Sequence, residues 1–171
     1  MQSRRERDRL MNYGYRDLMI TLALEHEWRV GALLGLGSGT LMTRILEEVP
    51  DLFIVGVDHF VRRDRRDRIM SMKRAHRGSC VIYAARTSQA AVMVDEQRFD
   101  FVFLDAARKY GCVRSDLRMW WAKTKVGGWF GGRAYGLEHP GVVAAVNDRF
   151  GPRVRNLGYS VWSVTRTEDL L

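Results

Sequence analysis

The chain has few of the residues that mark secreted, disulfide-rich or membrane-spanning proteins. It contains two cysteines, Cys80 and Cys112, which are far apart and not in a CxxC pair. This spacing excludes a disulfide scaffold and a cysteine-based zinc site. No apolar run approaches the ~20 residues needed to span a bilayer, and the charged start, Met1 to Arg9, has no apolar stretch of a secretory signal after it. These absences predict a cytoplasmic protein.

Proline and lysine are also scarce. Three prolines and no low-complexity tract leave little room for linkers, and a chain of 171 residues fits one compact domain. Lysine occurs only at positions 73, 109, 123 and 125, so nearly all of the basic residues are arginines. The formal net charge is +8 at pH 7 and 46% of the residues are hydrophobic, which is ordinary for a globular protein.

Apolar periodicity predicts a regular alternation of helices and strands. Near-continuous apolar runs predict strands over 29–36, 52–57, 80–84, 99–104 and 126–132, and two closing strands over 153–157 and 159–165 joined at Gly158. Amphipathic stretches predict helices over 4–27, 41–49, 61–77, 88–96, 115–123 and 141–150.

This alternation is typical of an α/β fold, a mostly parallel, doubly wound sheet with helices on both faces. The last two strands are too close for a helical crossover, so we expect them to form an antiparallel hairpin at one edge. The predicted organisation is an N-terminal helical segment over 1–28 and a single domain over 29–171.

A glycine-rich loop follows the first predicted strand. Its sequence is Gly35-Leu36-Gly37-Ser38-Gly39-Thr40. Glycines let the backbone turn tightly and approach a ligand closely, and the N-terminus of the next helix offers free N–H groups. The dinucleotide fingerprint G-x-G-x-x-G would need glycine at position 40, and no Gly-Lys-Ser/Thr follows. The loop therefore argues against NAD binding and excludes a P-loop.

An acidic residue stands where a ribose would be bound. The second predicted strand ends at Asp58, 19 residues after Gly39. In doubly wound folds, an acidic residue at that strand tip accepts hydrogen bonds from the ribose hydroxyls. The loop and Asp58 together predict that the chain binds a nucleoside cofactor.

Several segments resemble a known family. They are Phe99-Asp100-Phe101-Val102-Phe103-Leu104-Asp105, Asp116-Leu117, Trp120-Trp121, Gly127-Gly128-Trp129-Phe130-Gly131-Gly132 and His139-Pro140-Gly141-Val142. Over residues 29–165 the chain resembles class I S-adenosylmethionine-dependent methyltransferases. Within them it is similar to the small-molecule enzymes often called family 24, relatives of the catechol-type O-methyltransferases. The resemblance implies a Rossmann-like, seven-stranded sheet with a reversed final strand.

The resemblance also implies roles for individual residues in binding S-adenosylmethionine. Gly35, Gly37 and Gly39, with Leu36 and Ser38 between them, would lie under its methionine part. Asp58 would hold the ribose with His59 beside it, and Thr87 and Ser88 would lie near the adenine. Asp105 would sit at the tip of the fourth strand and face the transferring methyl group.

The sequence departs from the family at four places. After the third strand the family often has an acidic residue near the adenine, and here stand Arg86 and Thr87. The other three departures lie near the ends of the first, fourth and fifth strands. The family usually has an acidic residue at position 33, Gly-x-His after Asp105 and His-Asp-Tyr after the fifth strand. Here stand Leu33, Ala106-Ala107-Arg108 and Arg133-Ala134-Tyr135. Hard divalent cations need several oxygen ligands, so we expect no metal site.

The replaced positions predict how an acceptor is bound. Arg108 and Arg133 at the mouth of the site predict recognition of an anionic acceptor, because guanidinium groups bind carboxylate or phosphate with two hydrogen bonds. Tyr110 and Tyr135 are candidate substrate contacts. A hydroxyl acceptor usually needs a base. Asp105 and His139 are the main candidates, and His59 is a further one.

Most of the net charge lies on the predicted helix over 61–77. Arg62, Arg66, Lys73 and Arg77 recur at helical spacing and share a face, which could bind nucleic acid or could simply be a solvated helix face. The helix carries no aromatics to stack on bases, and we expect it to lie away from the cofactor chemistry.

The main hypothesis is a metal-independent methyltransferase that acts on a small anionic acceptor, most simply at oxygen. One alternative is a catalytically degenerate regulatory or structural domain that still binds the cofactor. Another is an RNA-modifying methyltransferase that uses the basic helix. A homodimer is a further expectation, because a second subunit could cover an open pocket.

Overall fold

The computed structural model describes residues 14–60 and 63–168. The start of the predicted helix over 4–27 and the position of Arg62 lie outside these residues. The helices are α2 (Tyr15–Glu25), α3 (Thr40–Glu48), α4 (Arg63–Ala75), α5 (Thr87–Ala91), α6 (Tyr110–Trp121), α7 (Pro140–Phe150) and the short 3-10 helix η1 (Gly151–Arg153). The strands are β1 (Val30–Leu34), β2 (Phe53–Val57), β3 (Cys80–Tyr83), β4 (Phe99–Leu104), β5 (Thr124–Gly132), β6 (Arg155–Gly158) and β7 (Val161–Thr165).

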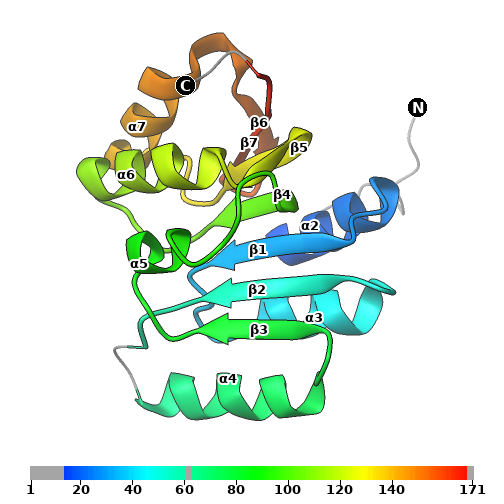
Figure 1. The fold of residues 1–171 in the computed structure, drawn as a ribbon. Coiled ribbons are helices and arrows are strands. Elements are labelled where there is room, and N and C mark those ends of the chain that lie inside the picture. The colour runs from blue at the N-terminus through cyan, green and yellow to red at the C-terminus, as the bar shows by residue number, and fades with distance from the viewer. Residues whose placement is uncertain (1–13, 61–62, 169–171) are drawn as a thin grey trace, which may run out of the picture.

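The strands form a seven-stranded sheet in the order β3-β2-β1-β4-β5-β7-β6. The first five pair in parallel, whereas β7 runs antiparallel to both β5 and β6 (Figure 1). The predicted fold class is therefore confirmed, including the C-terminal hairpin and the reversed final strand. In the described residues, no helix is long and apolar enough to cross a membrane.

Helices cover both faces of the sheet, as near-continuous apolar strands require. Buried side chains of α2, α3 and α4, such as Met19, Ile45 and Ile69, pack on one face. Those of α5, α6 and α7, such as Ala90 and Trp120, pack on the other. Successive residues of β1 alternate between the two cores, and Leu33 is buried in the first of them. The position where the family has an acid is thus part of the apolar core in this chain.

Two helix boundaries differ from the predictions. Helix α5 ends at Ala91 rather than at residue 96, and the next two residues, Val92 and Met93, are exposed despite being apolar. Helix α6 begins at Tyr110, five residues before the predicted start at Ser115, and buries Val113 as well as Leu117. Both differences between predicted and observed helix ends have the same cause. The rest of the fold determines which apolar residues are buried, and therefore which of them belong to a helix.

The closing hairpin turns one residue later than predicted. Strand β6 includes Gly158, and the turn is made by Tyr159 and Ser160, whose φ angles are 53° and 58°. A two-residue hairpin loop of type I′ needs positive φ at both central residues, which matches the right-handed twist of the strands. Tyrosine and serine rarely adopt positive φ angles. The sequence pattern therefore predicted the turn at the neighbouring Gly158.

Candidate functional site

The site lies where the strand order reverses between β1 and β4, the usual position of ligand crevices in open α/β sheets. The Gly35 N–H donates to the Val57 carbonyl at 2.8 Å, and the Asp105 N–H donates to the Leu34 carbonyl at 2.7 Å. A Cβ on Gly35 would lie 2.6 Å from the Asp105 carbonyl oxygen, so only glycine fits there. The tips of β1, β2 and β4 are held together by these contacts.

The glycine loop has a backbone that other residues adopt with difficulty. The φ angles of Gly35, Gly37 and Gly39 are 85°, 56° and 81°, in the region where L side chains are strained. A Cβ on Gly37 would meet no atom within 4 Å, so the loop backbone there is open to a neighbouring ligand. Gly39 is the N-cap of α3, so the loop leads directly into the N-terminus of that helix.

A cavity of about 780 Å³ opens at this edge of the sheet, well within the range of cofactor pockets. Seven of the predicted cofactor residues line it, namely Gly35, Gly37, Asp58, His59, Thr87, Ser88 and Asp105. Three others do not. The Leu36 side chain is buried in the core, Ser38 pairs with Thr40 at 2.8 Å, and Gly39 faces Ile69. The structure therefore brings together residues from four loops that are distant in sequence.

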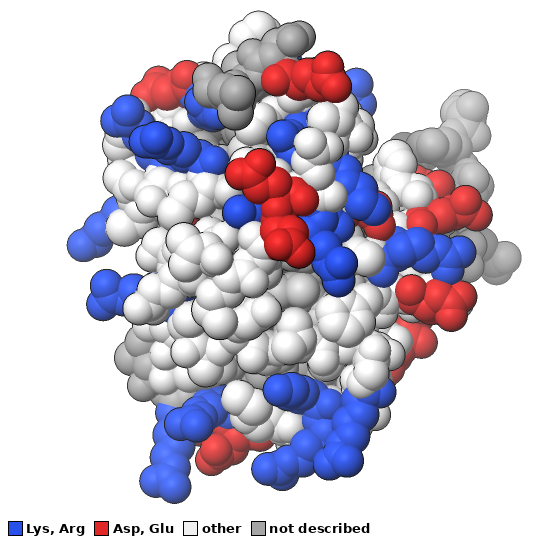
Figure 2. Space-filling view, viewed as in Figure 1, with Lys and Arg blue, Asp and Glu red and all other residues white. Residues whose placement is uncertain are grey.

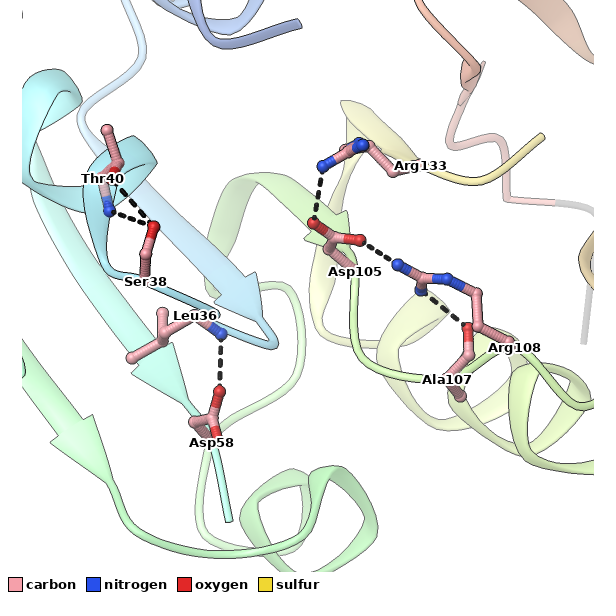
Figure 3. Close-up of polar contacts among 8 residues, drawn as sticks. All are labelled: Leu36, Ser38, Thr40, Asp58, Asp105, Ala107, Arg108 and Arg133. Carbon is pink, nitrogen blue, oxygen red and sulfur yellow. Dashed lines mark hydrogen bonds and ion pairs between the residues drawn. The ribbon is translucent and has the colours of Figure 1, made fainter. Parts of the chain in front are cut away.

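Asp58 joins the glycine loop to the end of β2. Its two carboxylate oxygens accept one backbone hydrogen bond each, both at 2.9 Å. Oδ2 accepts from the Leu36 N–H (Figure 3), and Oδ1 accepts from the Phe60 N–H. A carboxylate has about four acceptor sites, so each oxygen keeps room for a further donor. Asp58 thus shapes the loop and still presents acceptors to the cavity.

Asp105 lies between two arginines, as Figure 3 shows. Arg108 Nη2 is 2.6 Å from Oδ1, and Arg133 Nη1 is 3.5 Å from Oδ2. The Arg133 guanidinium also lies 3.9 Å from the centre of the Tyr15 ring, so helix α2 supports it. Burial raises the pKa of Asp105 above the usual 3.8, although the positive charges of Arg133 and Arg108 oppose the rise.

The other predicted acceptor and catalytic residues lie outside the cavity lining. The Tyr110 hydroxyl donates to Asp148 at 2.8 Å, and the Tyr135 hydroxyl donates to Asn147 at 2.6 Å. Both partners belong to α7, so the two tyrosines anchor that helix. His139 is the residue before α7 and caps its start through the backbone. Of the candidate bases, Asp105 and His59 line the cavity and His139 does not.

Asp116 is a cavity residue to which the sequence predictions gave no role. It is only 4% exposed, and its Oδ1 accepts a hydrogen bond from the Thr87 hydroxyl at 2.5 Å. Burial raises its pKa above 3.8, and the Thr87 bond partly offsets the rise. A signal was present: Asp116 stands three residues after Val113 and four before Trp120, so it shares the apolar face of α6.

Two arginines line the cavity, and one of them corrects a sequence expectation. Arg65, from α4, and Arg86, which follows β3, both line the cavity. The basic helix was expected to lie away from the cofactor chemistry, and for Arg65 this is wrong. The parallel pairing of β2 with β3 places the loops after both strands at one edge, so the start of α4 reaches the cavity.

The buried state of Asp116 predicts a specific dependence of stability on pH. Because its folded pKa is raised, the ionised form is penalised in the fold, and this cost grows as pH rises from 3.8 through the folded pKa. Replacing Asp116 with asparagine keeps an acceptor for Thr87 and removes the titration. We expect the difference in free energy of unfolding, variant minus wild type, to increase across that window and then level off.

Urea denaturation at several pH values checks this expectation for Asp116. The Asp95→Asn variant, which changes an exposed carboxyl, is the matched control and should show a smaller pH-dependent difference. A difference for Asp116→Asn that does not change with pH would contradict the buried, perturbed carboxyl.

The structure gives no support for a metal centre within 14–60 and 63–168, where no group of three His, Cys, Asp or Glu side chains could hold an ion. Asp105, the only acidic residue left at the family's metal positions, is engaged by two arginines instead.

These features define the fold of class I methyltransferases: the 3-2-1-4-5-7-6 sheet with one reversed strand and a glycine loop at the switch point. No protein-family model and no curated protein sequence matches the chain. Comparison with solved structures, in contrast, finds the same fold in several methyltransferases.

Three of those structures illustrate the likeness. The S-adenosylhomocysteine-bound methyltransferase PaMTH1 of Podospora anserina matches with a TM-score of 0.72 and 12% identity over 98% of this chain and 80% of that one. CalS11, the TDP-rhamnose 3′-O-methyltransferase of calicheamicin biosynthesis, matches at 0.71 and 14% over 95% and 80%. The Burkholderia thailandensis 1,6-didemethyltoxoflavin-N1-methyltransferase matches at 0.63 and 14% over 95% and 83%. At these identities the likeness establishes a shared fold.

Proposed function

We propose that the chain is an S-adenosylmethionine-dependent methyltransferase that acts on a small anionic acceptor, most simply at oxygen. One observation carries the proposal. The glycine loop, Asp58 and Asp105 come from three strand tips and line one cavity at the switch point of the sheet. Two of the solved structures with this fold contain S-adenosylhomocysteine, the product of the cofactor.

The residues present fit this cofactor. The backbone is open above Gly37, where a Cβ would meet no atom, and it can approach the methionine part closely. Asp58 keeps acceptor capacity for the two ribose hydroxyls. Thr87 and Ser88 would flank the adenine. The buried carboxyl of Asp116 beside Thr87 would limit the depth of the cavity at its adenine end.

When bound, the cofactor supplies an activated methyl group on a sulfonium, and its transfer needs no covalent intermediate with the protein. The chain's contribution is to hold an acceptor oxygen in line with that methyl group. Asp105 would accept the proton that a hydroxyl acceptor loses. Burial favours this task, because it raises the pKa of Asp105 and makes its carboxylate a stronger base than a free aspartate.

Excess positive charge around Asp105 supports an anionic acceptor. Arg108 and Arg133 contact its carboxylate, and the charge of Arg16 acts on it as well. Three guanidinium groups against one carboxylate leave net positive charge. In the described part of the chain, the buried Nε of Arg133 has no hydrogen-bond partner. A carboxylate or phosphate on the acceptor would use these donors.

Cys112 provides a direct test of where the cofactor binds. Cys112 is exposed and lines the cavity, whereas Cys80 is buried. Burial also raises the pKa of the Cys80 thiol. We expect saturating S-adenosylmethionine to slow the alkylation of Cys112 by N-ethylmaleimide at least tenfold, because the bound cofactor blocks access. Mass spectrometry of the two cysteine peptides measures each rate separately.

Cys80 serves as the internal control, since it should react only when the protein unfolds. The Cys112→Ser variant should lose the fast phase entirely. An alkylation rate that stays the same when calorimetry shows the cofactor bound would place the cofactor elsewhere and overturn the assignment of this cavity.

A further inference from the structure

Helix α4 carries many more basic than acidic residues. Seven basic residues stand on it or directly after it, Arg63, Arg65, Arg66, Arg68, Lys73, Arg74 and Arg77, against two acidic residues, Asp64 and Asp67. Figure 2 shows Lys and Arg gathered along the edge of the molecule where α4 lies, with little negative charge among them. We call these seven residues the basic face.

Three charges of the basic face have no acidic partner within the described part of the fold. Helix α4 is held to the sheet by the buried side chains of Ile69 and Met72 alone. Arg66, Arg74 and Arg77 are exposed, and no ion pair joins them to an acidic side chain of the described residues. Unpaired cations on one surface repel one another, so a dense row of them is stabilised by an external anion.

The basic face continues into the cavity. Arg65 belongs to α4 and lines the cavity, and Arg86 lines it from the loop after the neighbouring strand β3. Arg65 therefore belongs both to the basic face and to the lining of the cavity. This continuity is a property of the tertiary structure and distinguishes the face from an isolated charged helix.

The side chains of the basic face favour a phosphate-bearing partner over a membrane surface or a protein interface. A membrane-surface helix needs apolar side chains to insert, but none of the large exposed apolar side chains of the described residues lies on α4. Protein interfaces favour aromatic anchors, and residues 63–77 contain no aromatic ring except that of His76. What remains is an arginine-rich surface, which suits a row of phosphates.

We propose that the basic face of α4 binds the phosphate backbone of RNA, with Arg65 leading from this surface to the cavity. The absence of stacking side chains favours a helical stem over an unpaired strand on the face itself. The choice of RNA over duplex DNA rests on the proposed methyltransferase activity, with an anionic nucleotide of the RNA as a second acceptor beside the small one. RNA displays unpaired nucleotides beside its stems, whereas a duplex DNA target must first be flipped out of the stack.

Fluorescence anisotropy with a labelled RNA hairpin that carries an unpaired 3′ overhang tests the proposal. The affinity of the wild-type protein should fall steeply between 50 and 200 mM salt. The double variant Arg66→Gln/Arg77→Gln should bind at least tenfold more weakly at low salt, with a salt slope reduced by about 2, because two phosphate contacts are lost.

The matched control is Arg118→Gln/Arg155→Gln, which removes the same charge from exposed positions on α6 and on β6, the strand at the opposite edge of the sheet. It should change RNA affinity less than twofold. Equal weakening by the two double variants, tighter or equal binding of a DNA duplex of the same sequence, or no RNA binding at 50 mM salt would each overturn the proposal.

Cofactor affinity, measured by calorimetry on the same variants, separates this proposal from the proposed function. Both double variants should bind S-adenosylmethionine like the wild type, since none of the four residues lines the cavity. RNA binding by a protein that does not bind the cofactor would leave the basic face in place and remove the methyltransferase. Cofactor binding by a protein that does not bind RNA would leave the proposed function in place and overturn the RNA proposal.

Discussion

Replacing Asp58 with alanine is expected to weaken the binding of S-adenosylmethionine at least tenfold. Hydrogen bonds to charged groups contribute about 1.5–3 kcal/mol, and about 1.4 kcal/mol corresponds to a tenfold change in affinity. The variant loses the acceptors for the ribose hydroxyls and also the two backbone contacts that hold Leu36 and Phe60 in place. Isothermal titration calorimetry measures the loss.

Two further variants separate ribose binding from loop structure. Asp58→Asn keeps the size of the side chain and one acceptor oxygen, so it should retain more affinity than Asp58→Ala. Asp95→Ala removes an exposed carboxyl and should bind like the wild type. Unchanged affinity in a folded Asp58→Ala protein would refute the ribose assignment, and no binding by the wild type at millimolar cofactor would remove the proposed function altogether.

The second large effect is expected at Asp105. Replacing it with asparagine should lower kcat for methyl transfer about 10²- to 10⁴-fold, the usual contribution of general acid–base catalysis. Asparagine preserves the shape of the side chain and an acceptor for Arg108, so the cofactor affinity should change much less than kcat. Formation of S-adenosylhomocysteine with a panel of hydroxylated carboxylates and phosphates is the measurement.

The pH dependence of the wild-type enzyme gives an independent check. A base must be ionised to act, so activity should fall as pH decreases through the pKa of Asp105. Burial places that pKa above 3.8, and the midpoint of the acid limb should therefore lie above this value. An Asp105→Asn variant with wild-type kcat would exclude Asp105 as the base. A wild-type protein that binds the cofactor and methylates no acceptor would favour the catalytically degenerate domain.

Arginines at positions 108 and 133 show how far sequence reasoning reaches. Their departure from the family pattern predicted that they bind an anionic acceptor. However, the sequence does not show that both guanidinium groups contact Asp105, because Arg133 comes from the end of β5, 28 residues further along the chain. The anionic acceptor therefore stays a proposal, supported by the excess of positive charge and not by a free pair of arginines.

Asp116 and Arg65 mark the opposite limit. Asp116 stands on the buried side of α6, but its partner Thr87 is 29 residues away in sequence. Arg65 has the spacing of an ordinary surface arginine, and only the adjacency of the loops after β2 and β3 brings it to the cavity. Pairings of this kind depend on strand order, which local patterns do not encode.

The amino-acid sequence by itself determined the class of fold, the C-terminal hairpin, the glycine loop and the acidic tip of β2. These features follow from local rules: apolar periodicity, the conformational freedom of glycine and the length of a connection. Tertiary structure alone decided that Asp105 is held by two arginines, that Tyr110 and Tyr135 anchor α7, and that the basic helix touches the cavity. The physical reason is that burial and charge pairing arise between segments distant in sequence, once the sheet has set which strand tips meet.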